Sequence, residues 1–289
     1  MTSRKLSILL ILLTINSLFS QIKGKIVDEK NQPIPFVNIA IENENLGTTS
    51  EENGSFTIHE FDKNKKLVIS GLGFEKKIVV ASDGMIVVLK PAEIQLDEVV
   101  LIKKFKSKEI EIGKVADKVL QAFDNQARID IKYFPYLPKY KKTKFINRIA
   151  IYTDSKIENA AIKIHLYKMD KNGFPGEELF KKDFIVSVKK GTVKNTFNLE
   201  NFDVVMPKDG VFVGFEKLLI QKNKFEKTVV NPMTNVSKIQ ISYEPLLMIY
   251  RVEKPFSLVY SGGNWHKETN EFTEKTMVSE PAIHLILSN

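Results

Sequence analysis

The chain has 289 residues, which at roughly 150 residues per domain suggests about two domains. Hydrophobic residues make up 43% and charged residues 27%, which is ordinary globular usage and argues against a disordered or collagenous chain. The formal net charge is +8, and the lack of cysteine excludes disulfides, cysteine nucleophiles, iron–sulfur clusters and cysteine-based zinc sites.

The first twenty residues predict export. Arg4 and Lys5 precede an apolar run, Leu6–Leu13, and a more polar stretch ends at Ser20. This order is typical of a secretory signal peptide, and the run is shorter than the ~20 residues of a membrane-spanning helix. We expect residues 1–20 to be removed, which leaves no transmembrane span in a mature chain that is periplasmic, outer-membrane-associated or secreted. An N-terminal anchor or a buried helix is the alternative.

The basic residues do not indicate a nucleic-acid partner. They are scattered, with small clusters at Lys103–Lys104 and Lys139–Lys144. We interpret them as a solvated face and a basic linker, and a long-range field that attracts anionic partners is the alternative. Export and the lack of a recognition motif argue against binding to nucleic acid.

Apolar residues alternate with period two through the first part of the mature chain. They recur at Ile22 and Ile26, Val37, Ile39 and Ile41, Phe56 and Ile58, Leu67 and Ile69, Ile78 and Val80, and Ile86 and Val88. Asn53-Gly54 and Asp83-Gly84 separate some of these stretches and tolerate the positive φ of tight hairpins. The pattern predicts short, half-buried strands in an antiparallel sandwich.

Several strings of this region carry a resemblance to a known family. They are Gly24–Asp28, Gln32–Ile39, Gly47–Thr49, Glu51–Phe56, Leu67–Ser70, Gly73–Phe74, Val88–Lys90 and Leu96–Val100. In this order, over residues 22–101, they resemble the carboxypeptidase regulatory-like domain, as found at the N-terminus of TonB-dependent receptors. The resemblance implies a seven-stranded, transthyretin-like sandwich with an accessory role, which we assign to residues 21–102. It does not imply peptidase activity, because in carboxypeptidases this module lies beside the zinc-bearing catalytic domain.

The four histidines form no motif for metal or catalysis. Zinc hydrolysis needs about three His, Glu or Asp ligands and an open coordination position. His59, His165, His266 and His284 occur in no H-E-x-x-H or H-x-x-E arrangement. We interpret each of them as a surface or packing histidine. Ser261 has no G-x-S-x-G frame around it. We therefore expect no catalytic residue, no metal and no cofactor.

Residues 103–144 change character and predict a helix and a linker. A helical stripe of apolar residues runs through Ile112, Val115, Val119, Ala122 and Phe123. It predicts one amphipathic helix near 110–128 that packs against a sandwich, and a helix on a membrane surface is the alternative. The stretch 133–144, with two prolines and several lysines, is expected to be an extended connector.

The remaining residues, 145–289, predict a second β-domain. Apolar alternation or apolar stretches recur at Phe145–Tyr152, Ile162–Leu166, Phe184–Val188, Val193–Leu199, Val211–Phe215, Leu218–Ile220, Leu246–Val252, Phe256–Tyr260 and Ile283–Leu287. The pattern favours a jelly-roll-like β-sandwich, so the whole chain is expected to be all-β apart from the connecting helix. Ile164–Tyr167, Gly173–Leu179 and Pro207–Glu216 resemble a C-terminal region of envelope proteins that carry the regulatory-like domain. That resemblance brings no function with it.

One glycine-rich stretch is a candidate ligand site. Tyr260, Asn264, Trp265 and His266 surround Gly262–Gly263, and Trp265 is the single tryptophan of the chain. An exposed tryptophan beside tyrosine and asparagine is how many β-sandwiches stack a sugar ring and bond its hydroxyls. The alternative is a tryptophan that closes the end of the sandwich.

Two functional hypotheses follow. The first is a non-enzymatic, exported envelope protein that acts as a binding or assembly module, with a glycan or an envelope or surface protein as its partner. The second is an envelope hydrolase whose carboxylates converge from C-terminal loops. An open cleft at Trp265 and two carboxylates close together in a pocket, as in a glycosidase, are the features that separate the hypotheses. The oligomeric state is left open.

Overall fold

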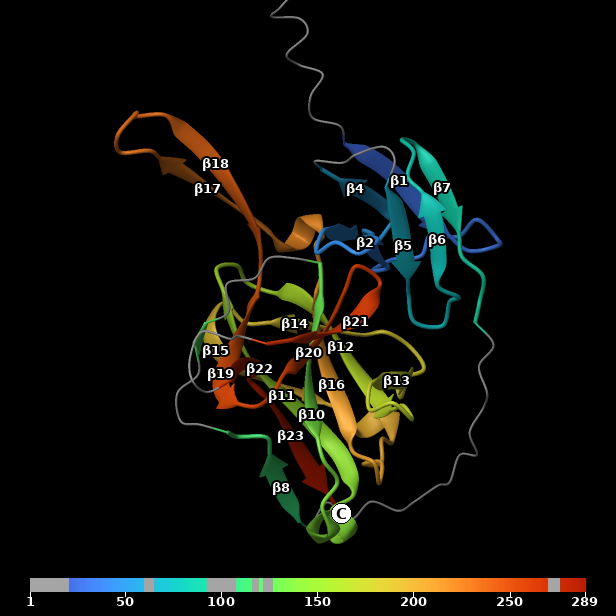
Figure 1. Cartoon of the computed structure of the whole chain (residues 1–289), viewed down its shortest axis with the longest axis vertical. Helices are drawn as coiled ribbons and strands as arrows, with labels where there is room; N and C mark the ends of the chain where they lie inside the picture. Colours follow the sequence, from blue (N-terminus) through green and yellow to red (C-terminus); the bar gives the residue numbers. More distant parts are fainter. Residues whose placement is uncertain (1–20, 60–64, 93–107, 116–119, 122–126, 270–275) are drawn as a thin grey trace, which may run out of the picture.

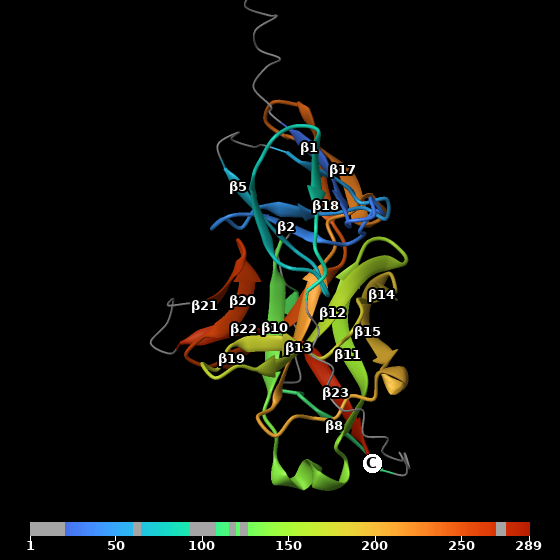
Figure 2. The same cartoon turned by 90° about the vertical axis from the view of Figure 1, so that its right-hand side faces the viewer.

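The computed structural model describes residues 21–59, 65–92, 108–115, 120–121, 127–269 and 276–289. It has a small N-terminal β-domain, a larger C-terminal β-domain and a hairpin that projects from the latter (Figures 1 and 2). The expected signal peptide, residues 1–20, lies outside the described residues. Within the described ranges, no helix is both long enough and apolar enough to cross a bilayer.

The described part of the N-terminal domain contains seven strands in two sheets. They are β1 (Ile22–Val27), β2 (Asn38–Ile41), β3 (Gly47–Thr49), β4 (Ser55–Ile58), β5 (Lys66–Ser70), β6 (Lys77–Val80) and β7 (Met85–Val88). The strand orders are β4-β1-β7 and β3-β2-β5-β6. Alternate residues such as Ile26, Ile39 and Leu67 are fully buried in one core, as the period-two pattern requires. The seven-stranded sandwich expected from the sequence is confirmed, but it is not wholly antiparallel, because β7 pairs with β1 in parallel.

The C-terminal domain is a sandwich of two larger sheets. Sheet 1 contains β10 (Ile129–Phe134), β12 (Ala160–Met169), β13 (Pro175–Glu178), β14 (Phe184–Val188), β16 (Val211–Lys217), β20 (Ser257–Ser261) and β21 (Asn264–Glu268). Sheet 2 contains β8 (Glu109–Ile112), β9 (Leu120–Gln121), β11 (Phe145–Ser155), β15 (Gly191–Asn198), β19 (Leu246–Glu253), β22 (Met277–Pro281) and β23 (Ile283–Ser288). Short 3₁₀ turns occur at Pro138–Lys142, Glu200–Phe202 and Gln221–Asn223.

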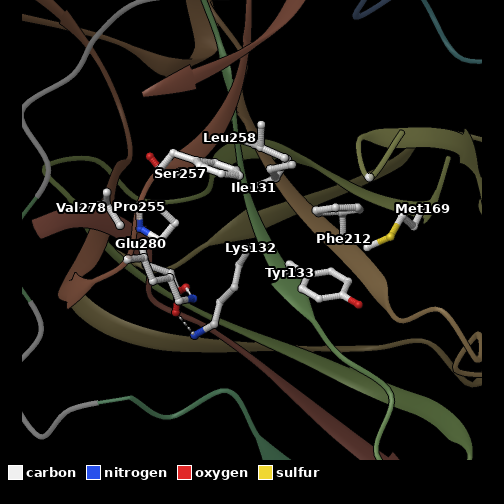
Figure 3. A pocket seen from close by; sticks show the side chains of 13 residues that line it. Ile131, Lys132, Tyr133, Met169, Phe212, Pro255, Ser257, Leu258, Val278 and Glu280 are labelled. Atoms are coloured by element: carbon white, nitrogen blue, oxygen red, sulfur yellow. Dashed lines mark hydrogen bonds and ion pairs between the residues drawn. The ribbon is translucent and has the colours of Figure 1, made fainter. Parts of the chain in front are cut away.

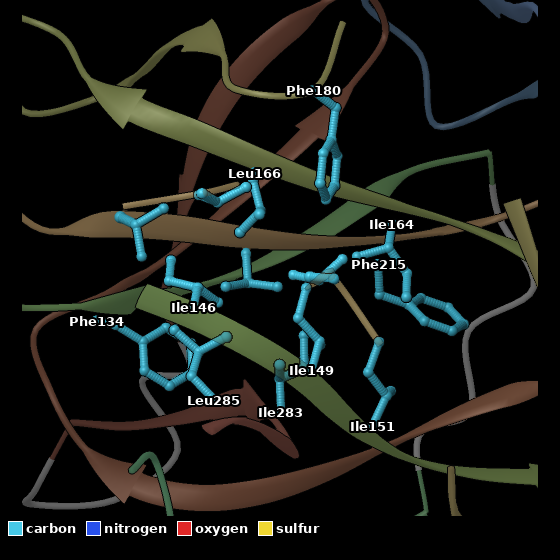
Figure 4. Packing of buried hydrophobic residues seen from close by; sticks show 14 of the residues in the cluster. Phe134, Ile146, Ile149, Ile151, Ile164, Leu166, Phe180, Phe215, Ile283 and Leu285 are labelled. Atoms are coloured by element: carbon cyan, nitrogen blue, oxygen red, sulfur yellow. The ribbon is translucent and has the colours of Figure 1, made fainter. Parts of the chain in front are cut away.

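The core of the C-terminal domain lies between its two sheets. Ile149 and Ile151 of β11 meet Ile164 and Leu166 of β12, and Phe215 of β16 fills the same layer (Figure 4). All five side chains are buried. Burial of such side chains stabilises each by about 1.5–3 kcal/mol, so this layer holds the two sheets together. The expected C-terminal β-sandwich is confirmed.

The connecting helix expected near residues 110–128 is not confirmed. The described residues of that range include strands β8 and β9, which pair with β23 and β19 of sheet 2. Ile110 and Ile112 pack against the core, while Glu109 and Glu111 alternate with them. The segment 133–144 begins in β10, which lies between β16 and β20 in sheet 1. Residues 109–112 therefore follow the alternating pattern of a strand, and the helical stripe that begins at Ile112 was misleading there.

Strands β17 (Lys224–Val230) and β18 (Ser237–Tyr243) form a two-stranded sheet of their own, which we call the arm (Figure 1). Cross-strand pairing places Thr228, Val230, Ile239 and Ile241 on one face of the arm. Most of its side chains are exposed, and Met233 at the tip is 95% exposed. The arm thus buries little of its own apolar surface.

Sheet 1 carries a second apolar cluster on the face turned away from the core. Its buried members are Ile129 and Ile131 of β10, Phe212 of β16 and Leu258 of β20. Seven partly buried side chains pack against them: Tyr133, Tyr167, Met169, Phe174, Phe256, Tyr260 and Trp265. We call this surface the outer face of sheet 1, and both cavities described below open on it.

Candidate functional site

A cavity of about 260 Å³ lies between the two domains, on the outer face of sheet 1. We call it the interdomain cavity. The N-terminal domain contributes Asn38 of β2 and the segment Ser70–Gly73 to its lining. The C-terminal domain contributes Ile129, Lys163, His165, Tyr167, Glu178, Glu216, Tyr260 and Trp265. The site therefore needs both domains.

Strand alternation brings the polar lining together. Lys163, His165 and Tyr167 share one face of β12, while the residues between them point into the core. In the register with β16, Lys163 lies opposite Glu216 and His165 lies opposite Gly214. A Cβ on Gly214 would lie 3.1 Å from the Cβ of His165, so glycine leaves room for the imidazole.

His165 is held between two carboxylates. Its Nδ1 lies 2.9 Å from Glu178 Oε2 and its Nε2 lies 2.9 Å from Glu216 Oε2. Glu178 also accepts the backbone N–H of Leu166, and Glu216 accepts Nδ2–H of Asn38 from the other domain at 2.9 Å. His165 and Glu216 are almost entirely removed from solvent. Each of these contacts satisfies a polar group that would be costly to bury alone.

The surroundings fix the charges of this cluster. Burial lowers the pKa of His165, but the charge of Glu178 and the hydrogen bonds to Glu178 and Glu216 raise it to about 9. Burial raises the pKa of Glu216, but the nearby charge of Lys163 and the hydrogen bond from His165 lower it to about 2. At neutral pH the imidazole is therefore a cation that donates from both nitrogens, and Glu216 is an anion.

Lys163 extends the cluster to the N-terminal domain. Its Nζ donates to the backbone carbonyl of Phe36 at 2.6 Å and lies 3.2 Å from Asp183 Oδ1. Its side chain is buried. The lysine thus places a positive charge beside Glu216 and also ties sheet 1 to the loop before β2.

Aromatic rings form the other wall of the interdomain cavity. Trp265 meets Tyr260 and Tyr167 edge-on, at centroid distances of 5.2 and 5.6 Å. Tyr167 in turn stacks on His165, with an interplanar angle of 8°. Trp265 and Tyr260 are half-buried, so each ring keeps some surface open. Tyrosine and tryptophan combine an apolar face with a polar edge, which suits a ligand that is apolar on one side and polar on the other.

The structure separates the four residues that the sequence grouped as a ligand site. Tyr260 and Trp265 are cross-strand partners and line the interdomain cavity. Asn264 and His266, which flank Trp265 on β21, are exposed and are not among the lining residues. The Nε2–H of His266 donates to the carbonyl of Ser261 in the same hairpin at 3.0 Å.

The two glycines of this stretch dock the hairpin on the N-terminal domain. Gly262 and Gly263 have φ of +56° and +88°, and the carbonyl of Gly262 accepts the N–H of Asn43. A Cβ on Gly263 would lie 2.7 Å from Val68. Glycine is needed here both for the backbone conformation and for the close approach. The glycine-rich loop is therefore a contact between domains.

Sequence reasoning missed the charged half of the site. Glu178, Glu216, Lys163 and Asn38 come from strands far apart in the chain. One local signal was present, because Lys163 and His165 interrupt the apolar and buried first part of β12 at alternate positions. Two polar residues on one face of a buried strand indicate a second buried surface.

A second buried histidine lies in sheet 2. His284 Nε2 is 2.7 Å from the hydroxyl of Tyr250, and its Nδ1 is 2.5 Å from Glu111 Oε1, which Lys194 also contacts. Burial lowers the pKa of His284, and Glu111 opposes that shift. The cluster lines neither cavity described here. In the part of the chain that the structure describes, no group of three His, Asp or Glu side chains is arranged to hold a metal.

Comparison with known proteins places one domain in a family. Residues 22–101 match the family model described as the CarboxypepD_reg-like domain, a non-catalytic module, which confirms the resemblance seen in the sequence. No curated protein matches the chain. Similar solved structures include a DUF3823 family protein from Bacteroides ovatus (9% identity, TM-score 0.21, 92% of this chain and 97% of that one). Another is infectious bursal disease virus strain Gx (12%, 0.19, 93% and 63%). TM-scores this low are no evidence of a shared fold.

Proposed function

We propose that this chain, with its carboxypeptidase regulatory-like domain at residues 22–101, is an exported, non-catalytic module that binds a glycan of the cell envelope in the interdomain cavity. The observation that carries the proposal is the composition of that cavity. One wall has Trp265 and Tyr260, and the other has buried side chains of fixed charge. Export is part of this proposal, and it is supported by residues 1–20, whose sequence is typical of a signal peptide.

The cavity has the two kinds of surface that a sugar requires. The half-open rings of Trp265 and Tyr260 offer apolar faces to the C–H side of a sugar ring. Beyond the bonds that they already make, Glu178 has further lone pairs and Asn38 a second amide N–H for the hydroxyls of the sugar. A volume of about 260 Å³ is at the small end of ligand sites, which suits one sugar ring and not a long segment.

The charges favour binding over hydrolysis. Glu178 and Glu216 do line one cavity, as the hydrolase hypothesis asks. A glycosidase, however, needs one carboxyl group that stays protonated near neutral pH. Here the pKa of Glu216 lies at about 2, and His165, with a pKa of about 9, sits between the two carboxylates. Neither group is poised to exchange a proton at pH 7.

The test is a glycan array probed with the purified protein, followed by calorimetry on the sugars that bind. Trp265→Ala should weaken binding at least tenfold, because it removes the stacking wall. Asn264→Ala is the matched control, since Asn264 is the neighbouring residue on β21 and does not line the cavity. The proposal fails if no glycan binds, or if both variants bind like the wild type.

The same samples test the hydrolase alternative. Release of reducing ends from a bound glycan would be measured over time with the wild type and with Glu216→Gln. We expect no release from either protein. Release that disappears in Glu216→Gln would show that the cavity is an active site and would contradict a binding role.

A further inference from the structure

A second cavity, of about 280 Å³, opens on the outer face of sheet 1 beside the interdomain cavity (Figure 3). We call it the apolar cavity. Ile131, Phe212 and Leu258 are buried beneath it, and Tyr133 and Met169 form one side. The two cavities are lined by neighbouring side chains on the same face of a strand. On β10, for example, Ile129 lines the interdomain cavity and Ile131 lines the apolar cavity. The cavities are therefore neighbours with separate linings.

The lining of the apolar cavity offers few free polar groups. The hydroxyl of Tyr133 already donates to the carbonyl of Asp209 at 2.8 Å. Phe256, Pro255 and Val278 complete the wall. A hydrocarbon occupant gains from contact with such a surface, whereas a polar occupant would lose its hydration there without compensation.

The rim of the apolar cavity is positively charged. Lys267 lies opposite Leu258 in the β20–β21 register, and its Nζ is 4.4 Å from the ring centroid of Phe256. Lys254 lines the cavity and pairs with Glu280. The carboxylate of Glu280 is shared, because the buried Lys132 lies 3.1 Å from its Oε1.

The charge balance of these groups favours an anion. Lys132 and Lys254 share one carboxylate, that of Glu280, while Lys267 adds a third ammonium beside Phe256, which lines the cavity. Lys267 extends its aliphatic stem along an apolar surface and keeps its ammonium at the edge, where it can meet a negative headgroup. The ring of Phe256 attracts this ammonium and helps to hold it in place.

We propose that the apolar cavity binds the chain of an anionic amphiphile, a single-chain carboxylate of the fatty-acid type, with its headgroup between Lys254 and Lys267. The inference does not rest on the glycan proposal, because the two cavities have different lining residues. The volume limits the occupant to one chain, since about 280 Å³ is at the lower end of ligand sites.

The experiment measures binding of sodium dodecanoate below its micelle concentration, by calorimetry and by displacement of the fluorescent probe N-phenyl-1-naphthylamine. We expect saturable binding to the whole protein. Lys267→Glu should weaken it at least tenfold, because the headgroup then meets a carboxylate. Lys238→Glu is the control, since it makes the same charge change on the arm, away from the cavity. Met169→Trp, which fills the cavity, should also prevent binding, with circular dichroism to verify folding.

Further ligands decide between chemistries. Dodecyl maltoside and dodecyltrimethylammonium carry the same chain with a neutral and a cationic head, and both should bind at least tenfold more weakly than dodecanoate. Asn264→Ala, at a position that lines neither cavity, should leave dodecanoate binding unchanged. The proposal is overturned if dodecanoate does not bind, if Lys267→Glu and Lys238→Glu bind it alike, or if the protein binds only vesicles of anionic phospholipid and no monomeric amphiphile.

Discussion

Protonation of His165 and folding of the protein are coupled. The residue is buried between Glu178 and Glu216, and its pKa rises from 6.5 to about 9. Glu216 shows the opposite behaviour, with its pKa lowered from 4.5 to about 2. The folded state therefore holds a proton on the imidazole more tightly, and one on Glu216 less tightly, than the unfolded chain does.

The stability that these two groups contribute should consequently be greatest between about pH 4.5 and 6.5. Above pH 6.5 the unfolded chain releases the His165 proton first, so stability falls as the pH rises through 9. Below pH 4.5 the unfolded chain protonates at Glu216 first, so stability falls as the pH drops toward 2. The alkaline loss from His165 alone is about 3 kcal/mol, from 1.36 kcal/mol per pKa unit.

Urea unfolding at pH 5.5 and pH 9 checks the alkaline limb. The variant His165→Gln should have a lower unfolding free energy than the wild type at pH 5.5. Its unfolding free energies at pH 5.5 and pH 9 should differ much less than those of the wild type. An unfolding free energy of the wild type that is equal at both pH values would contradict the charged cluster.

Gly263 offers a second test at the scale of one residue. Gly263→Ala strains a backbone with φ of +88° and sets a methyl group 2.7 Å from Val68 of the other domain. Gly173→Ala is a matched control, with φ of +81° and no atom within 4 Å of the new methyl group. We expect urea unfolding to show a loss of about 1 kcal/mol for the control and a further 1–3 kcal/mol for Gly263→Ala. Equal losses would mean that the hairpin does not dock as described.

Local sequence identified only the aromatic part of the interdomain cavity. Trp265 and Tyr260 lie in one short stretch with glycines, so their type and spacing drew attention to them. Asn38 and Glu216 are hydrogen-bonded across 178 residues of sequence, and nothing near either one indicates the other. Asn264 looked like a ligand group because it adjoins Trp265, but alternation along β21 turns it to the other face.

At the scale of elements, strand patterns were predictable wherever one face of a strand is buried. The alternation through 22–88 gave the N-terminal strands, and β11 and β12 follow the same rule. β8 was misjudged because its four residues, Glu109–Ile112, are too few to outweigh a helical stripe downstream. The strand conformation of β8 depends on its pairing with β23, and a single sequence does not reveal which strands pair.

The arm should be dispensable for folding. Its side chains are mostly exposed, and isolated two-stranded hairpins are only marginally stable in water. Replacement of residues 225–242 by a short glycine-serine link should change the melting temperature by no more than a few degrees. The equivalent replacement of the β20–β21 hairpin, which carries Leu258 and Trp265, should destabilise the protein strongly because it removes buried side chains. Differential scanning calorimetry compares the two.

Proteolysis gives an independent measurement on the arm. Trypsin should cut the folded protein early at Lys227 or Lys238, which are exposed on the arm, and leave the two sandwiches intact. A large loss of melting temperature on deletion, or resistance of both sites to trypsin, would show that the arm is part of the folded body.

At the scale of the whole molecule, the two domains meet through polar contacts and through a small apolar cluster, in which Phe36 packs against Ala161, Leu218 and Ile220. Besides the bond from Asn38 to Glu216, the N–H of Leu219 donates to Thr49 and the N–H of Gln221 donates to Glu51. Contacts of this kind are directional, so they fix the relative orientation of the domains more than they add stability. The interdomain cavity keeps its shape only while they hold.

Asn38→Asp should separate the domains. The substitution removes a donor and sets a second carboxylate against Glu216, whose oxygen lies 2.9 Å from the present amide. Like charges in a buried site repel strongly, so we expect a larger radius of gyration in small-angle X-ray scattering and an unfolding free energy lower by about 2 kcal/mol or more. Asn38→Ala, which removes the bond without adding charge, should have the smaller effect. If the two variants scatter alike, charge at this contact does not set the domain arrangement.

Trp265, the single tryptophan of the chain, lies at the contact between the two domains and lines the interdomain cavity. Its fluorescence is thus free of any competing emitter of the same kind. A shift of the tryptophan emission to longer wavelength would show that water has reached the ring as the domains separate. Quenching of the emission, or a shift to shorter wavelength, would show that a ligand has entered the cavity. Trp265 is thus an intrinsic fluorescence probe, and both events can be followed in real time without an attached dye.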